Sequence, residues 1–259
     1  SLDPMEYPYH HPGPYHLYCQ KSQMQPVLLT GAVSVGRGYE GMMAERERNM
    51  VNAADSYVAI DLETTGIGAK RERITEIGMV KVENGAVTDT YHTLVNPGRP
   101  IPEHITELTG IDDDMVKDAP MIQDVIGEVI AFCGTLPVLG HQIMFDYGFL
   151  VQAAVNGKLR FERSGIDTLK LCRKFMPPEE KKNLAAACAY FHAAQDTAHR
   201  ALSDAMAAHE LYQAMKRLHL SGNEDAFAPK VLQYKAKKER QATQRQKQHL
   251  HDLLKYNKI

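Results

Sequence analysis

From about residue 56, apolar and polar residues follow a pattern that predicts strands first and helices later. The stretch YVAIDLE is an apolar strand that ends in two carboxylates, and RITEIGMVKVE and AVTDTYHTLV form two further strands. Asn84 and Gly85 lie between these two, and they are residues that a two-residue hairpin turn favours. The three strands should therefore pair in sequence order.

Apolar residues recur at helical spacing after these strands. The segment MIQDVIGEVIAFC has apolar residues three and four apart, and PEHITELTG is a shorter helix that Gly110 closes. Further helices are predicted over residues 144–154, 167–174, 183–191 and 200–218, with a brief strand over residues 137–140. The sheet should be mixed and covered by helices.

The two ends of the chain differ from this α/β region, which we place at residues 55–220. Residues 1–54 are rich in Pro, Tyr, His and Met without sustained periodicity, so we expect a weakly ordered, flexible N-terminal extension. Residues 221–229, SGNEDAFAP, are typical of a linker. Residues 230–259 contain good helix formers and predict a separate basic helical tail.

The charge of the chain is unevenly distributed. The formal net charge is −2, yet residues 230–259 carry nine Lys or Arg and two acids, which gives +7 there and −9 on the remainder. A basic end of this kind is suited to a polyanion, to a protein partner or simply to solvent, and these three interpretations stay open.

The composition narrows the class of protein. Hydrophobic residues make up 44% of the chain, enough for a substantial core. The four cysteines form no C-x-x-C pair, so neither a zinc site nor a disulfide framework is expected. No apolar run reaches the length of a membrane span and the first residues lack the pattern of a secretion signal, so we expect a cytoplasmic protein without membrane contact.

Four acidic residues and one histidine are candidates for chemistry. Asp61 and Glu63 lie two apart on a strand, so both side chains point to the same side and repel unless positive charge is near. Asp146 lies among core residues in GHQIMFDYGFL. His199 precedes Asp204 by five positions. On one continuous helix their side chains would point about 140° apart. If the helix begins just after His199, the imidazole can lean toward Asp204 as a general base.

Carboxylates that converge on one pocket are compatible with folding when divalent cations neutralise them. Ligand sets made only of oxygen favour Mg²⁺ or Mn²⁺. Two such ions about 3.5–4 Å apart are a recurrent device for in-line attack on a phosphodiester. A histidine with a pKa near neutrality can accept the proton of the attacking water.

Three motifs carry a resemblance to a known family. IDLETTG, GHQIMFD and HRALSD, in this order, resemble the exonuclease motifs of the DEDDh family. The segment NPGRPIPEHITELTGIDDDMVKDAP is similar to one in the proofreading exonuclease of bacterial DNA polymerase III, found as the epsilon subunit or within the Gram-positive replicative polymerase. This resemblance covers residues 56–218. It implies a ribonuclease H-like fold, with a mixed five-stranded sheet flanked by helices.

The resemblance also implies roles for individual residues. Asp61, Glu63 and Asp204 would be direct ligands of two divalent cations. Asp146 would complete the shell of the second ion, through water, and His199 would be the general base.

Substrate contacts are implied at four further positions. Thr64 and Thr65 match positions that touch the terminal nucleotide in the family. Gln142 stands where the family usually has Asn, so we expect an altered rate or substrate preference and retained activity. His141 is either a support of the core or a substrate contact.

The predicted function is that of a metal-dependent 3′-to-5′ exonuclease acting on DNA with single-stranded or frayed 3′ ends. It would release nucleoside 5′-monophosphates, in proofreading or repair. Two alternatives remain: an RNA-trimming exonuclease of the same superfamily, and a non-catalytic module that binds nucleic-acid ends. The expected partners are a nucleic acid and, through the basic tail, a polymerase or another replication or repair protein.

Overall fold

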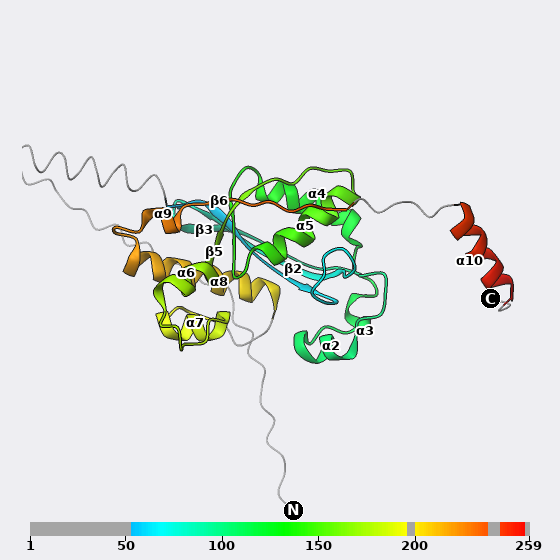
Figure 1. Ribbon diagram of the computed structural model, residues 1–259, viewed down its shortest axis with the longest axis horizontal. Coiled ribbons are helices and arrows are strands. Elements are labelled where there is room, and N and C mark those ends of the chain that lie inside the picture. Colours follow the sequence, from blue (N-terminus) through cyan, green and yellow to red (C-terminus); the bar gives the residue numbers. More distant parts are fainter. Residues whose placement is uncertain (1–52, 196–199, 238–243, 257–259) are drawn as a thin grey trace, which may run out of the picture. The chain divides into compact units, whose positions relative to one another are not determined.

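The computed structural model describes residues 53–195, 200–237 and 244–256 (Figure 1). The strands are β1 (Tyr57–Thr64), β2 (Ile74–Glu83), β3 (Ala86–Leu94), β4 (Val138–Gly140), β5 (Ser164–Asp167) and β6 (Lys230–Val231). The helices are α2 (Glu103–Thr109), α3 (Asp113–Val116), α4 (Ile122–Cys133), α5 (Met144–Asn156), α6 (Thr168–Phe175), α7 (Leu184–Phe191), α8 (Ala201–His219), α9 (Glu224–Phe227) and α10 (Gln244–Tyr256). Within these ranges no helix is long and apolar enough to cross a membrane.

The strands form one mixed sheet in the order β3-β2-β1-β4-β5-β6. β1, β2 and β3 pair antiparallel in sequence order, as predicted, while β4 and β5 run parallel to β1. Asn84 and Gly85 connect β2 to β3 with φ angles of 52° and 79°. Two left-handed residues in succession are what a type I′ hairpin turn requires, so the predicted hairpin is confirmed.

The sheet has six strands, so the prediction of five strands is corrected. The sixth strand, β6, pairs antiparallel with β5 and comes from residues that we expected in a separate tail. Residues 221–229, which we expected to be a linker, are instead packed on the domain, because Phe227 is fully buried in the core. A single Phe in a polar segment and a two-residue strand give no periodicity, so the pattern of apolar residues could not indicate either feature. The predicted N-terminal extension lies outside the described residues except for Ala53 and Ala54, which pack on the core.

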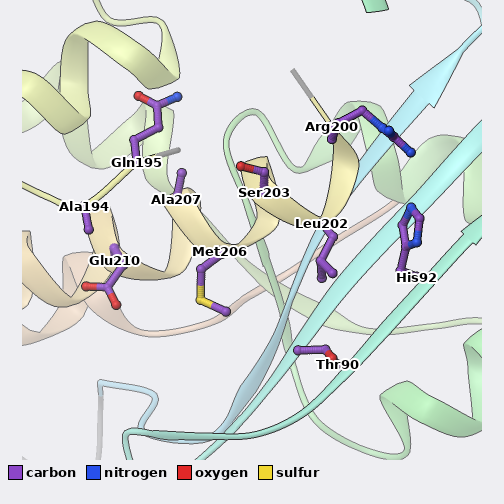
Figure 2. Close-up of a pocket in the computed structure, with 10 residues that line it drawn as sticks. All are labelled: Thr90, His92, Ala194, Gln195, Arg200, Leu202, Ser203, Met206, Ala207 and Glu210. Atoms are coloured by element: carbon purple, nitrogen blue, oxygen red, sulfur yellow. The ribbon is translucent and has the colours of Figure 1, made fainter. Parts of the chain in front are cut away.

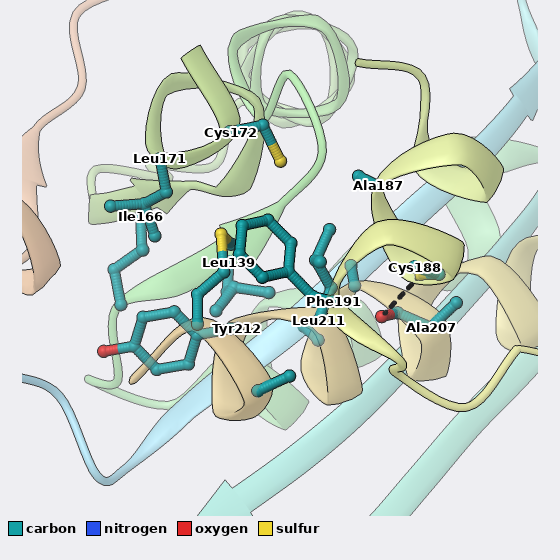
Figure 3. Close-up of a cluster of buried hydrophobic side chains, with 14 of the residues drawn as sticks. Leu139, Ile166, Leu171, Cys172, Ala187, Cys188, Phe191, Ala207, Leu211 and Tyr212 are labelled. Atoms are coloured by element: carbon teal, nitrogen blue, oxygen red, sulfur yellow. Dashed lines mark hydrogen bonds between the residues drawn. The ribbon is translucent and has the colours of Figure 1, made fainter. Parts of the chain in front are cut away.

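Helices cover both faces of the sheet, and β1 supplies residues to both layers. Tyr57 and Ala59 pack against α6, α7 and α8, whereas Val58, Ile60 and Leu62 pack against α4 and α5. Strand alternation produces this division. Figure 3 shows the first layer, where Leu139 and Ile166 lie near Leu211, Tyr212 and Phe191 and the thiol of Cys188 approaches the carbonyl of Ala207. Cys133, Cys172 and Cys188 are free and buried, and Cys19 lies outside the described residues.

The first turn of α8 lies directly on β2. A methyl group at Gly78 would overlap the backbone of Ala201 and Leu202, so only glycine permits this approach. Two residues earlier on the same face of β2, the buried carboxylate of Glu76 accepts a hydrogen bond of 3.1 Å from the backbone N–H of Ala201. Gly78 and Glu76 therefore fix where α8 begins.

We predict that Gly78→Ala lowers the free energy of unfolding by at least about 2 kcal/mol, because backbone has to move to admit the methyl group. Gly127→Ala is the matched control, since Gly127 lies within α4 with no atom within 4 Å of the added group, and it should be neutral or stabilising by up to about 1 kcal/mol. Urea denaturation of the two variants measures both values. Equal stability of Gly78→Ala and the wild type would contradict the close seating of α8.

Candidate active site

The carboxyl end of β1 carries two acidic side chains on one side of the sheet. Asp61 and Glu63 follow Tyr57 and Ala59 along the face that α8 covers, and both are half-buried. A β-bulge lies directly after Glu63 in the pairing with β2. Bulges change the direction of side chains near the ends of strands. Here β1 ends at Thr64, so the chain leaves the sheet directly after the two carboxylates.

The first turn of α8 brings a third acid to this pair. One carboxylate oxygen from each of Asp61, Glu63 and Asp204 lies within 4.8 Å of the other two. The seating of α8 on β2 determines this approach, because Asp204 lies three residues beyond Ala201. Asp204, far along the chain from Asp61 and Glu63, thus completes a set of three carboxylates that present oxygen atoms to one point.

Asp146 lies behind this cluster in the first turn of α5. Its side chain is 3% exposed, and it accepts a hydrogen bond of 3.1 Å from the backbone N–H of Leu62. β4 ends at Gly140, and its pairing with β1 extends no further along β1 than Ala59. Asp146 therefore satisfies a donor of β1 and brings a fourth carboxylate beside Asp61.

Burial and mutual repulsion raise the pKa values of these acids. The pKa of Asp61 lies well above its ordinary range because of burial first, and then because of the charges of Asp146, Glu63 and Asp204. Burial and the charge of Asp204 raise the pKa of Glu63 to about 7. Burial likewise raises the pKa of Asp146. The protein therefore holds negative charge where it is unfavourable unless a cation or a proton neutralises it.

An ionic cluster centred on one buried carboxylate lies next to these acids. Glu76, fully buried on β2 opposite Glu63, accepts hydrogen bonds from Arg200 Nε and Nη2 at 2.8 and 2.6 Å and lies 2.6 Å from His92 Nε2. Burial alone would raise the pKa of Glu76, but hydrogen bonds from Arg200, His92 and Ala201 together lower it. The ionised Glu76 thus joins β2, β3 and the residue that precedes α8.

Figure 2 shows Arg200 and His92 at one end of a groove of about 790 Å³ between α8 and β3. Leu202 and Met206 supply apolar lining along α8. The four acids of the candidate site are not among the residues that line this groove. The groove and the carboxylate cluster are therefore separate features that share the start of α8.

Neither Glu76 nor Arg200 was predicted as a site residue. A single acid in the apolar strand ITEIGMV was the available signal, because a buried carboxylate requires a partner. The sequence could not name that partner, since Arg200 lies 124 residues away. His199, the predicted general base, lies outside the described residues and directly precedes Arg200.

The two predicted threonine contacts shape the turn after β1. Both are buried: the hydroxyl of Thr64 donates to the carbonyl of Gly66 at 2.8 Å, and that of Thr65 donates to Glu72 at 2.7 Å. The backbone N–H of Arg73 donates to the Thr65 hydroxyl at 3.0 Å. These bonds hold the loop that begins at Gly66 against the end of the strand.

His141 and Gln142 occupy the turn between β4 and α5. His141 Nε2 donates to the carbonyl of Lys182 at 2.7 Å, and Nδ1 lies 3.0 Å from the Thr168 hydroxyl. Burial lowers the pKa of His141, which keeps it neutral. These internal bonds favour the support role for His141. Gln142 is exposed with φ at 72°, a left-handed conformation that Asn adopts more readily, so the usual Asn of the family also suits the backbone here.

The donor set fits a hard divalent cation. Asp61, Glu63 and Asp204 offer only carboxylate oxygens, and Asp146 adds a fourth carboxylate behind them. Such oxygen sets are typical of Mg²⁺ and Mn²⁺. The pKa of Glu63 stays raised although the charge of Arg200 acts to lower it, so the protein's own cation does not fully neutralise the cluster.

Comparison with known proteins agrees with this geometry. The model of the exonuclease family matches residues 58–212. The DNA polymerase III PolC-type of Caldanaerobacter subterraneus is 35% identical over 189 residues, which cover 71% of this chain and 14% of that protein. The DNA polymerase III subunit epsilon of Aquifex aeolicus is 36% identical over 159 residues, which cover 61% of this chain and 78% of that protein. This chain thus spans only a small part of the PolC-type proteins.

Solved structures share the fold. Exonuclease X, solved in complex with 5′-overhanging duplex DNA, is 27% identical with a TM-score of 0.51, and the match covers 62% of this chain and 92% of that one. Escherichia coli Exonuclease I, solved with a dT13 oligonucleotide, is 14% identical with a TM-score of 0.55 over 63% of this chain and 41% of that one. The matched family model contains β1, α5 and the start of α8, which carry the four acids, and the chain therefore belongs to the exonuclease family.

Proposed function

We propose that this exonuclease removes nucleotides from the 3′ end of DNA, with single-stranded or frayed ends as substrate and two divalent cations, Mg²⁺ or Mn²⁺, as cofactors. The products are nucleoside 5′-monophosphates, and the role is proofreading or repair. The observation that carries this proposal is the convergence of Asp61, Glu63 and Asp204 within 4.8 Å, with Asp146 behind them.

Each residue has a part in this proposal. Asp61, Glu63 and Asp204 hold the cations directly, and Asp146 completes the shell through water. Divalent cations in such a site activate water and stabilise the leaving oxygen of the phosphodiester. His199 accepts the proton of the attacking water as general base. Arg200, the next residue along the chain, is anchored on Glu76 by two hydrogen bonds.

The choice of DNA is supported by the relatives. The two relatives described above are named as DNA polymerase III proteins, and the two structural neighbours were solved with DNA. A cytoplasmic setting is part of the same proposal. RNA trimming and binding without cleavage remain the alternatives that the assay below separates.

The tail is proposed as a contact for a polymerase or another replication or repair protein. Leu250, Leu253 and Leu254 of α10 are exposed apolar residues on a basic helix, a composition suited to a protein partner. A chain that ends at Lys237 should therefore degrade free oligonucleotides at the wild-type rate. A large loss of affinity would instead assign the tail to nucleic acid.

The function is tested with end-labelled single-stranded DNA and RNA, and with duplexes that have paired or mispaired 3′ ends. We expect shortening from the 3′ end of DNA with Mg²⁺ or Mn²⁺ and none with chelator. Asp204→Asn should lower kcat at least about a hundredfold, since removal of one transition-state electrostatic contact typically costs this much.

His199→Ala should lower kcat by a similar factor with a smaller change in KM.

Asp225→Asn, an exposed acid of α9, is the matched control and should retain full activity. Faster degradation of RNA than of DNA would favour the trimming alternative. Binding of both polymers without cleavage would favour the non-catalytic module. Full activity of repurified Asp204→Asn would refute the metal-ligand assignment.

The raised pKa values predict a dependence of stability on pH in metal-free protein. The folded state holds protons on Asp61 and Glu63 more tightly than the unfolded state does, because the pKa of each carboxyl is raised. The contribution of Glu63 to stability is therefore present below about pH 4.5 and is lost as pH rises through about 7, and that of Asp61 is likewise lost as pH rises. His141 and His209, whose pKa values burial lowers, act in the opposite direction over this range. A variant without the charge repulsion is therefore needed as reference.

We expect that the melting temperature of Asp61→Asn minus that of the wild type, both without metal, increases as pH rises from 5 to 8. Added Mn²⁺ should raise the melting temperature of the wild type, more at pH 8 than at pH 5, because the cation competes with protons. Differential scanning calorimetry measures both effects. An equal Mn²⁺ effect on Asp61→Asn and wild type would exclude this cluster as the binding site.

A further inference from the structure

The residues that follow α9 run as a strap across α5 instead of leaving the domain. Within residues 230–237, Leu232, Tyr234 and Ala236 are turned toward the core while the residues between them are exposed. The family model ends at residue 212, so the strap lies beyond the part of the chain that the family describes.

The strap is held at three points. β6 pairs with β5, and the absence of a side chain at Gly165 leaves room for Leu232. At the far end, buried Gln152 of α5 donates to the carbonyl of Lys237 at 2.7 Å and accepts from its backbone N–H at 3.1 Å. This pair of bonds imitates the pairing of two strands and fixes the extended backbone.

Tyr234 lies between these anchors, against Gly148 of α5. A methyl group at Gly148 would lie 3.0 Å from the Tyr234 ring, so the ring rests almost on the helix backbone. Glycine within a helix costs roughly 1 kcal/mol relative to alanine. The contact between the Tyr234 ring and the backbone of α5 at Gly148 offsets this cost.

Tyr234 also forms one wall of a pocket of about 460 Å³, which the loop after β1 and the first turns of α5 line from the other sides. Phe145, which precedes Asp146, forms another wall with Phe149, and their ring centroids are 5.0 Å apart. Ile67, in the loop that follows β1, lies at the edge of the pocket and is 92% exposed. A flat apolar ligand would cover Ile67 and contact the aromatic rings.

The charge around the pocket indicates the class of ligand. Lys70 and Arg71 are exposed on the loop wall, and Lys235 is exposed next to Tyr234 on the strap. Residues 1–229 carry a net charge of −9, so two exposed basic side chains on the loop wall depart from the character of the domain. Aromatic walls with flanking cations are the combination that binds single-stranded nucleic acid.

We propose that the strap completes a binding site for one nucleobase of the strand that enters the active site, with Tyr234 as a stacking residue that contributes to affinity. This inference rests on the proposed function, because the ligand is the strand whose 3′ end reaches Asp61 and Asp204. Lys70, Arg71 and Lys235 bind the flanking phosphates. The chemical class of the ligand is a nucleotide within a single strand.

The test compares Tyr234→Leu, which keeps apolar bulk, with Tyr234→Phe, which keeps the ring. Gln233→Ala on the exposed side of the strap is the matched control. The substrates are a single-stranded DNA oligonucleotide and the same oligonucleotide with abasic residues near its 3′ end. Tyr234→Leu should raise KM for the normal oligonucleotide at least about fivefold, the lower bound for base–aromatic stacking, with kcat retained. On the abasic substrate it should match the wild type.

The comparison of two substrates separates stacking from a merely structural role. A structural defect would change both substrates equally, and that result would overturn the inference, as would a Tyr234→Leu variant that equals the wild type on the normal oligonucleotide. Tyr234→Phe and Gln233→Ala should both behave as the wild type. Fluorescence anisotropy in an Asp204→Asn background gives the same comparison without turnover. Absence of cleavage by the wild type would therefore reject the proposed function while leaving the stacking inference testable.

Discussion

The seating of α8 on β2 is the constraint on which the candidate active site depends. Gly78 allows the backbone of α8 to touch the strand, and the buried carboxylate of Glu76 binds both Arg200 and the N–H of Ala201. A buried carboxylate that lost these partners would be strongly destabilising, so the start of α8 has little freedom to move. This fixed start places Asp204 opposite the end of β1.

The site itself opposes the stability of the fold. The protein brings Asp61, Glu63 and Asp204 together while burial raises the pKa of Asp61 and Glu63. Nearby, Glu76 is neutralised by its own partners and is kept ionised. The same strand pair therefore contains one acid whose pKa its hydrogen-bond partners lower and two, Asp61 and Glu63, whose pKa is raised. That contrast separates a structural carboxylate from candidate ligands.

Much of this arrangement was predictable from residue patterns. Alternation along YVAIDLE identified β1 and put Asp61 and Glu63 on one side, and Asn84-Gly85 identified the hairpin. Three motifs in order then indicated which distant acids would meet. The partners of Glu76 were not predictable, because burial and a contact across 124 residues leave no periodic signal. The strap was missed for a similar reason: its residues were predicted as the start of the basic helical tail, because two paired residues and a glutamine–backbone clamp leave no periodic pattern.

The most direct test of this account is the affinity of the site for Mn²⁺ in Glu76→Gln, measured by isothermal titration calorimetry. Glu76 is not proposed to touch the metal. It holds the start of α8, and its charge also raises the pKa of Asp61 and of Glu63. Glu128→Gln, which removes an acid bonded to Tyr91 on the opposite layer, is the control. We predict that Glu76→Gln weakens Mn²⁺ binding at least about tenfold in folded protein, as loss of a supporting contact commonly does. Wild-type affinity in Glu76→Gln would contradict the claim that this buried carboxylate sets the site.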